Sequence, residues 1–204
     1  MLIHRLEADG RADQSRMFEV MGLAVDQLND NIDRIVLYET LAHGLVKEKI
    51  EKISIGRFLN DLQRQIESAF TARSPKVEFD CECQGKPISG SPNALSVALT
   101  EAIQNASAYA TGPSVFVRIN HGANGTVFSV VNEGLCIEPL DAEEFFCPFL
   151  KCDKNANRST KGLGLGLPIA RLYAEQFSAT TELLPLDDRS GMEFRLIVPG
   201  ISTD

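Results

Sequence analysis

The feature that most constrains this chain is a run with glycine at every second position, Gly162-Leu163-Gly164-Leu165-Gly166-Leu167. Glycine weakens strands and helices, and it is favoured where the backbone takes unusual φ and ψ or lets a ligand approach closely. A helical pattern of apolar residues follows directly and extends to Phe177. A glycine-rich loop that opens a helix presents unpaired N–H groups and the positive end of the helix dipole, so the run predicts a phosphate cradle. A turn that serves only tight packing is the alternative.

Composition excludes several classes of function. The formal net charge of -8 argues against a general nucleic-acid binder. No apolar run approaches the ~18–20 residues that cross a bilayer, and the N-terminus does not resemble a signal peptide. We therefore expect a cytoplasmic chain without a membrane segment, although a parent protein can be membrane-anchored. Five cysteines without a metal-type pair favour free thiols in a reducing compartment.

Residues 12–41 predict one long helix with a narrow apolar seam. The seam residues recur at spacings of 3 and 4 and are Phe18, Met21, Val25, Leu28, Ile32 and Ile35. This strict heptad favours a helix–helix seam over an ordinary amphipathic helix, so we expect a homodimer through residues 18–35. Asp26, Asp30, Asp33 and Arg34 are expected on the solvated face. Asp9-Gly10 predicts a turn that separates residues 1–8 as the end of a preceding helix, and Gly44 is expected to cap the long helix.

The rest of the chain alternates between helical and strand patterns. Helices are expected at 55–70 and 95–110, a short strand or entry segment at 53–55, and strands at 77–81, 115–120, 126–131, 180–185 and 192–198. This order predicts an α+β fold, a two-layer α/β sandwich whose mixed sheet is covered by helices on one face. We expect a partial helical hairpin for dimerisation at 1–50 and a second domain at 51–204.

Three further segments carry chemistry. Glu101 and Asn105 lie four residues apart on one helix face, where a carboxylate and an amide can hold a hydrated Mg²⁺; an exposed hydrogen-bonded pair is the alternative. Asn132 ends a strand beside Gly134, a placement from which its side chain can reach a base edge at the floor of a pocket. The segment 145–149 is rich in phenylalanine, and basic residues follow it: Lys151, Lys154, Arg158 and Lys161. It predicts a basic lid, with a disordered loop as the alternative.

In this order, the four segments resemble the ATP-binding catalytic domain of sensor histidine kinases, in the superfamily shared with gyrase-type topoisomerases, heat-shock chaperones and mismatch-repair ATPases. The resemblance covers about residues 53–199. It implies ATP and Mg²⁺ as cofactors, with Glu101 and Asn105 as catalytic residues and Asn105 as the Mg²⁺ ligand. The ATP-binding residues that it implies are Asn105, Tyr109, Asn132, Gly134, Ile137, Phe149, Lys151, Lys161, Gly162, Leu163, Gly164, Leu165, Gly166 and Leu167.

The resemblance also implies a reaction and partners. The γ-phosphoryl group of ATP would pass to a histidine, and then to an aspartate of a response-regulator receiver domain. The family's first dimerisation helix, which carries the phosphorylated histidine, is essentially missing from this chain. His4 is the candidate nearest to that place, whereas His43 at a helix end and His121 in a hairpin loop are expected to be structural or solvated. We therefore expect the acceptor histidine outside this chain.

Three departures from the family pattern leave alternatives open. Asn132 replaces the usual aspartate, and a neutral hydrogen bond to adenine is weaker by roughly 1 kcal/mol. Cys136 replaces the second glycine of that motif. Ala108 stands where a lysine or arginine is common, a loss for which Lys154, Arg158 or Lys161 could compensate. A pseudokinase or phosphotransfer scaffold, and a serine kinase of the anti-sigma type, are the rival interpretations. Phosphohistidine is acid-labile and phosphoserine is not, which separates the two kinases.

Overall fold

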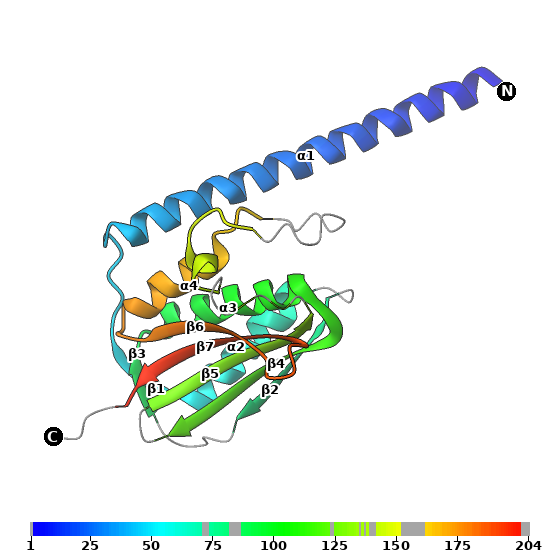
Figure 1. The fold of residues 1–204 in the computed structure, drawn as a ribbon. Coiled ribbons are helices and arrows are strands. Elements are labelled where there is room, and N and C mark those ends of the chain that lie inside the picture. The colour runs from blue at the N-terminus through cyan, green and yellow to red at the C-terminus, as the bar shows by residue number, and fades with distance from the viewer. Residues whose placement is uncertain are drawn as a thin grey trace.

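The computed structural model describes residues 2–70, 74–81, 87–122, 125–134, 136, 138, 142–151 and 162–200, with side chains from residue 16 onward. Figure 1 shows a long helix above a two-layer domain. The elements in chain order are α1 (Leu2–Ala42), β1 (Glu51–Ser54), α2 (Ile55–Ala69), β2 (Lys76–Cys81), β3 (Pro87–Gly90), α3 (Pro92–Tyr109), β4 (Ala110–Gly122), β5 (Gly125–Gly134), η1 (Ala142–Phe146), α4 (Gly166–Glu175), β6 (Thr180–Pro185) and β7 (Gly191–Pro199).

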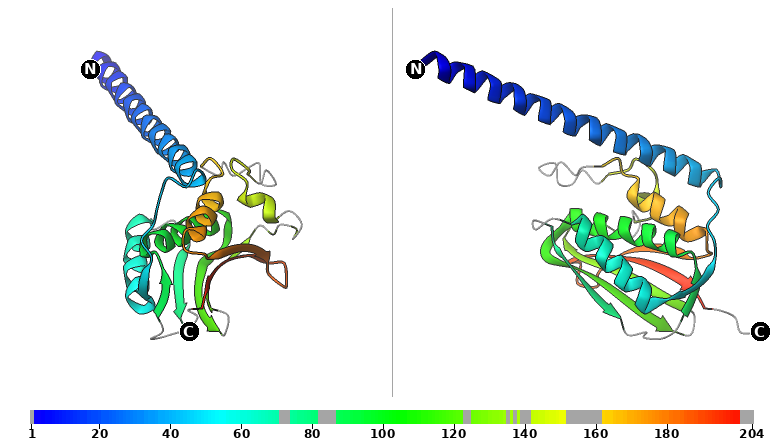
Figure 2. Two further views of the ribbon diagram at one scale, coloured as in Figure 1. Left: turned by 90° about the vertical axis from the view of Figure 1, so that its left-hand side faces the viewer. Right: turned by 180° about the vertical axis from the view of Figure 1, so that it is seen from behind.

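The main sheet has five strands in the order β2-β4-β5-β7-β6. β2 runs parallel to β4, and every other neighbouring pair is antiparallel. Helices α2, α3 and α4 cover one face of the sheet (Figure 2). Inward side chains such as Leu99, Ile103, Val117 and Phe128 are fully buried between the layers. The expected mixed sheet under a single layer of helices is confirmed.

The differences from the expected elements lie mainly at strand ends. β4 and β5 extend well past residues 115–120 and 126–131, because the flanking polar and glycine residues still pair across the two strands as far as Gly122 and Gly125. β3 was not expected. Its four residues pair antiparallel with β1 in a separate two-stranded sheet, and a segment that short carries little periodicity.

α1 is one continuous helix from Leu2 to Ala42 (Figure 1). The expected turn at Asp9-Gly10, and the separate helix before it, are therefore wrong. Good helix formers flank the pair on both sides, and one glycine in a helix interior costs only about 1 kcal/mol. The helix ends as predicted. Gly44 has φ +65, its N–H donates to Leu41 O at 2.9 Å, and that of Leu45 donates to Thr40 O at 3.0 Å, which is a Schellman end.

Among the side chains of α1 that the structure describes, from residue 16 onward, those at the C-terminal end are anchored in the core. Leu41 is 2% exposed, and Leu37 and Tyr38 pack against the same cluster. All six seam residues, in contrast, are exposed: Phe18, Met21, Val25, Leu28, Ile32 and Ile35. The linker that follows Gly44 and leads to β1 is attached to the start of α3. There, the Glu48 carboxylate accepts hydrogen bonds from Ser91 Oγ at 2.7 Å and Asn93 Nδ2 at 2.8 Å.

Candidate functional site

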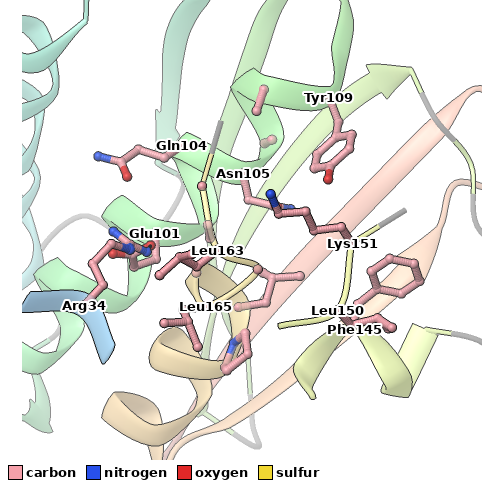
Figure 3. Close-up of a pocket in the computed structure, with 18 of the residues that line it drawn as sticks. Arg34, Glu101, Gln104, Asn105, Tyr109, Phe145, Leu150, Lys151, Leu163 and Leu165 are labelled. Carbon is pink, nitrogen blue, oxygen red and sulfur yellow. Dashed lines mark hydrogen bonds and ion pairs between the residues drawn. The ribbon is translucent and has the colours of Figure 1, made fainter. Parts of the chain in front are cut away.

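A cavity of about 570 Å³ lies between α3, the glycine loop and strands β5, β6 and β7, with α1 along one side. Small-molecule sites in proteins typically occupy about 300–1,000 Å³. The floor is mainly apolar and is formed by Val130, Leu183, Met192 and Phe194. The cavity thus combines an apolar floor with polar groups around it, and Figure 3 shows Glu101, Asn105 and Lys151 among these polar side chains.

The glycine loop forms one wall, and all six of its residues from Gly162 to Leu167 line the cavity. Gly164 has φ +72, and a Cβ at this position would lie 2.5 Å from Leu150 O, so only glycine fits. The Phe149 N–H donates to Gly164 O at 3.1 Å, which ties the loop to the preceding segment. α4 begins at Gly166 without any side-chain cap. Its first N–H groups are therefore left to solvent or to an anion.

α3 supplies a second wall, next to the glycine loop, where Glu101 Oε2 would lie 3.1 Å from a Cβ at Gly166. Ser91 Oγ caps the helix by accepting from the Ala94 N–H at 3.1 Å, and Pro92 occupies the first turn. Glu101, Asn105 and Tyr109 follow at four-residue intervals, so they form one stripe, and all three line the cavity. Asn105 is half-buried, and within the described residues its amide has no hydrogen-bond partner.

Glu101 is already engaged by α1. Arg34 Nη2 lies 2.5 Å from Glu101 Oε2, and the two side chains are 31% and 11% exposed. The same guanidinium lies next to Gly166, 3.8 Å from where a Cβ would stand. The expected solvated face of α1 is therefore wrong for Arg34. Asp26 and Asp30 stay exposed, yet they also line the cavity.

The polar end of the floor is Asn132. The residue is 5% exposed, and its Nδ2 donates to Glu133 O at the long distance of 3.4 Å. This weak bond orients the amide so that Oδ1 is left as an acceptor. An amide accepts a hydrogen bond from an exocyclic amino group as a carboxylate does, but without the charge.

The third wall comes from η1 and the segment after it, where Phe145, Leu150 and Lys151 line the cavity. Arg171 of α4 holds this wall in place. Its guanidinium lies 3.4 Å from the centroid of the Phe146 ring and donates to Glu143 Oε2 at 2.9 Å. The hydrogen bond from Arg171 keeps the pKa of Glu143 below its usual value. Arg171 thus joins η1 to α4 beneath the wall that carries a cation, Lys151.

Comparison with known proteins decides the family. The family described as "Histidine kinase-, DNA gyrase B-, and HSP90-like ATPase" matches residues 90–201, more than half of the chain. This chain belongs to that family. Among curated members, the sensor histidine kinase CpxA of Escherichia coli (strain K12) is 33% identical over 90 residues, which cover 44% of this chain and 20% of CpxA. The sensor protein VanSB of Enterococcus faecalis is 26% identical over 180 residues, which cover 88% of this chain and 40% of VanSB. The chain thus spans between a fifth and two fifths of these relatives.

Solved structures of family members share the fold. Full-length ShkA in complex with AMPPNP superimposes with a TM-score of 0.72 at 16% identity, over 86% of this chain and 37% of ShkA. The Acinetobacter baumannii histidine kinase AdeS gives a TM-score of 0.65 at 13% identity, over 89% of this chain and 83% of that one. At these identities the likeness shows the architecture, which is the one expected from the sequence.

Most of the site residues that we expected from the sequence lie together at the cavity. Those that line it are Glu101, Asn105, Tyr109, Asn132, Lys151, Gly162, Leu163, Gly164, Leu165, Gly166 and Leu167. Gly134 and Phe149 do not line it. Gly134 packs against Tyr109 O, and Phe149 is 55% exposed. Ile137, Lys154, Arg158, Lys161 and the side chain of His4 lie outside the described residues.

Sequence reasoning missed the contribution of α1 and the apolar floor. The floor residues Leu183, Met192 and Phe194 alternate along two strands, a signal that predicts their burial but not a ligand. The polar residues of α1 recur on the side opposite to the seam. From the sequence, polar residues on that side of the helix predict exposure to solvent. They do not predict contact with a domain that follows later in the chain. Within the described residues, no helix is long and apolar enough to cross a bilayer.

Proposed function

We propose that this chain binds ATP with Mg²⁺ and forms the catalytic part of a two-component sensor histidine kinase, transferring the γ-phosphoryl group to a histidine outside the chain. One arrangement carries the proposal. The uncapped start of α4 with its glycine loop, the free amide of Asn105, and an apolar floor ending at Asn132 line a single cavity. The named relatives are sensor histidine kinases, and ShkA was solved in complex with AMPPNP.

Each residue then has a defined task. The N–H groups of Gly164–Gly166 bind the phosphates, and Asn132 Oδ1 accepts from the adenine amino group. The Asn105 oxygen would hold Mg²⁺, which supplies charge neutralisation when bound. Mg²⁺ keeps most of its ligands as waters and phosphate oxygens, so a single protein amide fits this ion. Glu101 orients the incoming imidazole, and positioning with electrostatic stabilisation provides most of the catalysis.

The described histidines and the exposed seam of α1 bear on the acceptor and the partners. His43 Nδ1 lies 2.8 Å from Glu39 O, and His121 Nδ1 lies 2.7 Å from Thr126 Oγ1, so both imidazoles are engaged locally. As the family resemblance implies, we place the acceptor histidine on another helix outside this chain, and a receiver-domain aspartate takes the phosphoryl group next. The bare seam of α1 pairs with the same seam of a second copy, which buries six large apolar side chains.

The decisive experiment is a titration with a non-hydrolysable ATP analogue, with and without Mg²⁺. The intact chain should bind in a Mg²⁺-dependent way. Asn105→Ala should remove the dependence on Mg²⁺, and Asn132→Ala should weaken binding in both conditions. Asn60→Ala, an exposed amide on α2, is the matched control and should change nothing. No binding at millimolar analogue contradicts the proposal and leaves a scaffold with a kinase fold.

The type of kinase needs a second readout. With ATP and an added acceptor helix, the phosphorylated product should be acid-labile, as phosphohistidine is. An acid-stable product would instead support a serine kinase of the anti-sigma type.

A further inference from the structure

α1 has two functional faces on opposite sides. Its seam is apolar and exposed, whereas the residues that line the cavity are Leu23, Asp26, Gln27, Asp30, Asn31 and Arg34. We call the latter set the pocket-facing stripe. At about 100° per residue in an α-helix, the seam and the pocket-facing stripe lie on roughly opposite sides of α1. A second copy can therefore cover the seam while α1 still lies along the cavity of its own chain.

The position of α1 over the cavity depends on few contacts. The apolar anchor of Leu37, Tyr38 and Leu41 holds the C-terminal end. Arg34 lies one turn before that anchor. Among the described residues, its bond to Glu101 is the one ion pair that joins an α1 side chain to the rest of the chain. From Arg16 to Asp33, the side chains of α1 form no hydrogen bond with the described residues of the domain.

The charges of the pocket-facing stripe oppose a polyphosphate. Asp26 and Asp30 bring two carboxylates to the side of a cavity whose glycine loop is built for an anion. The one cation of the pocket-facing stripe, Arg34, is committed to Glu101 at 2.5 Å. The same bond ties up the carboxylate that the proposed reaction uses. In this position, the two carboxylates of α1 would repel a polyphosphate, and Glu101 is engaged by Arg34.

We infer that the Arg34–Glu101 ion pair is a latch that holds α1 across the nucleotide cavity in a resting state, and that the docked helix and a nucleoside triphosphate oppose each other. The second half of this inference rests on the proposed function, and the first half does not. Linkage is reciprocal, so any change that releases α1 must raise the affinity for nucleotide by the factor by which nucleotide favours release.

The latch itself is tested without nucleotide. Spin labels at positions 19 of α1 and 80 of β2, in a chain whose native cysteines are replaced and which is diluted with unlabelled chain, report the distance between helix and domain. The intact pair should give one narrow distance distribution. Arg34→Gln and Glu101→Gln should each broaden it, and the double variant should broaden it no further, because both changes break one bond. Arg57→Gln, an exposed arginine of α2, is the matched control. Unchanged distributions in both single variants overturn the latch.

The opposition is tested with the ATP analogue. Arg34→Gln should raise its affinity about fivefold or more, the lower end of typical coupling between sites. Asp26→Asn with Asp30→Asn should raise it about two- to fivefold at low salt and less at high salt, because screening weakens the repulsion. Asp33→Asn, an exposed α1 residue that does not line the cavity, is the control. Lower affinity in Arg34→Gln overturns the opposition, since Arg34 would then be a phosphate ligand. If no variant binds the analogue, the proposed function fails, while the distances still decide whether the ion pair holds α1.

Discussion

Replacing Gly164 by alanine should weaken nucleotide binding by about 30-fold or more, from strain confined to the glycine loop. An L-residue in the left-handed region, here φ +72, costs about 1–2 kcal/mol. The new Cβ would also lie 2.5 Å from Leu150 O and 3.0 Å from Phe149 C, two backbone atoms that cannot rotate away. Such overpacking costs about 1–3 kcal/mol. The sum is at least about 2 kcal/mol, and each 1.4 kcal/mol is a factor of ten in affinity.

The assay is the titration with ATP analogue, accompanied by thermal unfolding. Gly56→Ala is the matched control, since its Cβ meets nothing within 4 Å and its φ is ordinary; it should leave affinity unchanged and strengthen α2 slightly. The alanine variant can relieve its strain if the glycine loop leaves the observed conformation. The affinity for the ATP analogue should therefore fall more than the free energy of unfolding does. Unchanged affinity in Gly164→Ala would refute the reasoning, because the nucleotide would then bind without this loop geometry.

Three other perturbations give distinct readouts. Asn132→Asp should raise affinity for the ATP analogue about fivefold, since a charged acceptor strengthens the bond to adenine by about 1 kcal/mol; equal affinities would argue that Asn132 does not contact the base. Leu28→Glu should convert the dimer to monomer in sedimentation experiments, and a wild-type monomer would contradict the role of the seam. Burial, together with Glu48 and Glu101, raises the pKa of the Tyr173 phenol. Stability should therefore fall as pH rises from about 10 through this raised pKa, and Tyr173→Phe should reduce that loss in denaturant titrations.

The parts of the molecule that the sequence predicts are those whose chemistry repeats at a short, regular spacing. The glycine run, the pair Glu101 and Asn105, and the heptad from Phe18 to Ile35 each follow from local geometry of a loop or a helix. The strand pattern, with its closing hairpin, predicts the mixed sheet for the same reason. Local patterns also explain the error at Asp9-Gly10, where two turn residues are outweighed by the helix formers around them.

Contacts between distant segments have no such signal. Arg34 and Glu101 are 67 positions apart, and each was assigned from its own helix alone, one to solvent and the other to a metal site. Their pairing depends on how the linker from Leu45 to Ile50 places α1 against the domain. The linker in turn depends on the bonds from Glu48 to the start of α3. No spacing rule predicts these contacts, because they are properties of tertiary packing.

Because α1 is long, a small displacement at the Arg34–Glu101 contact corresponds to a large displacement at the N-terminal tip of the helix. α1 has 41 residues and is held in the core at its C-terminal end, just before Gly44, so at 1.5 Å per residue a rotation about this end would make it a lever about 60 Å long. Arg34 lies ten residues from Gly44, about 15 Å along that lever, which gives a ratio of about four. Opening the ion pair by about 3 Å would then move the N-terminal tip of α1 by roughly 12 Å. Conversely, a force applied at this tip would act on the ion pair about four times as strongly.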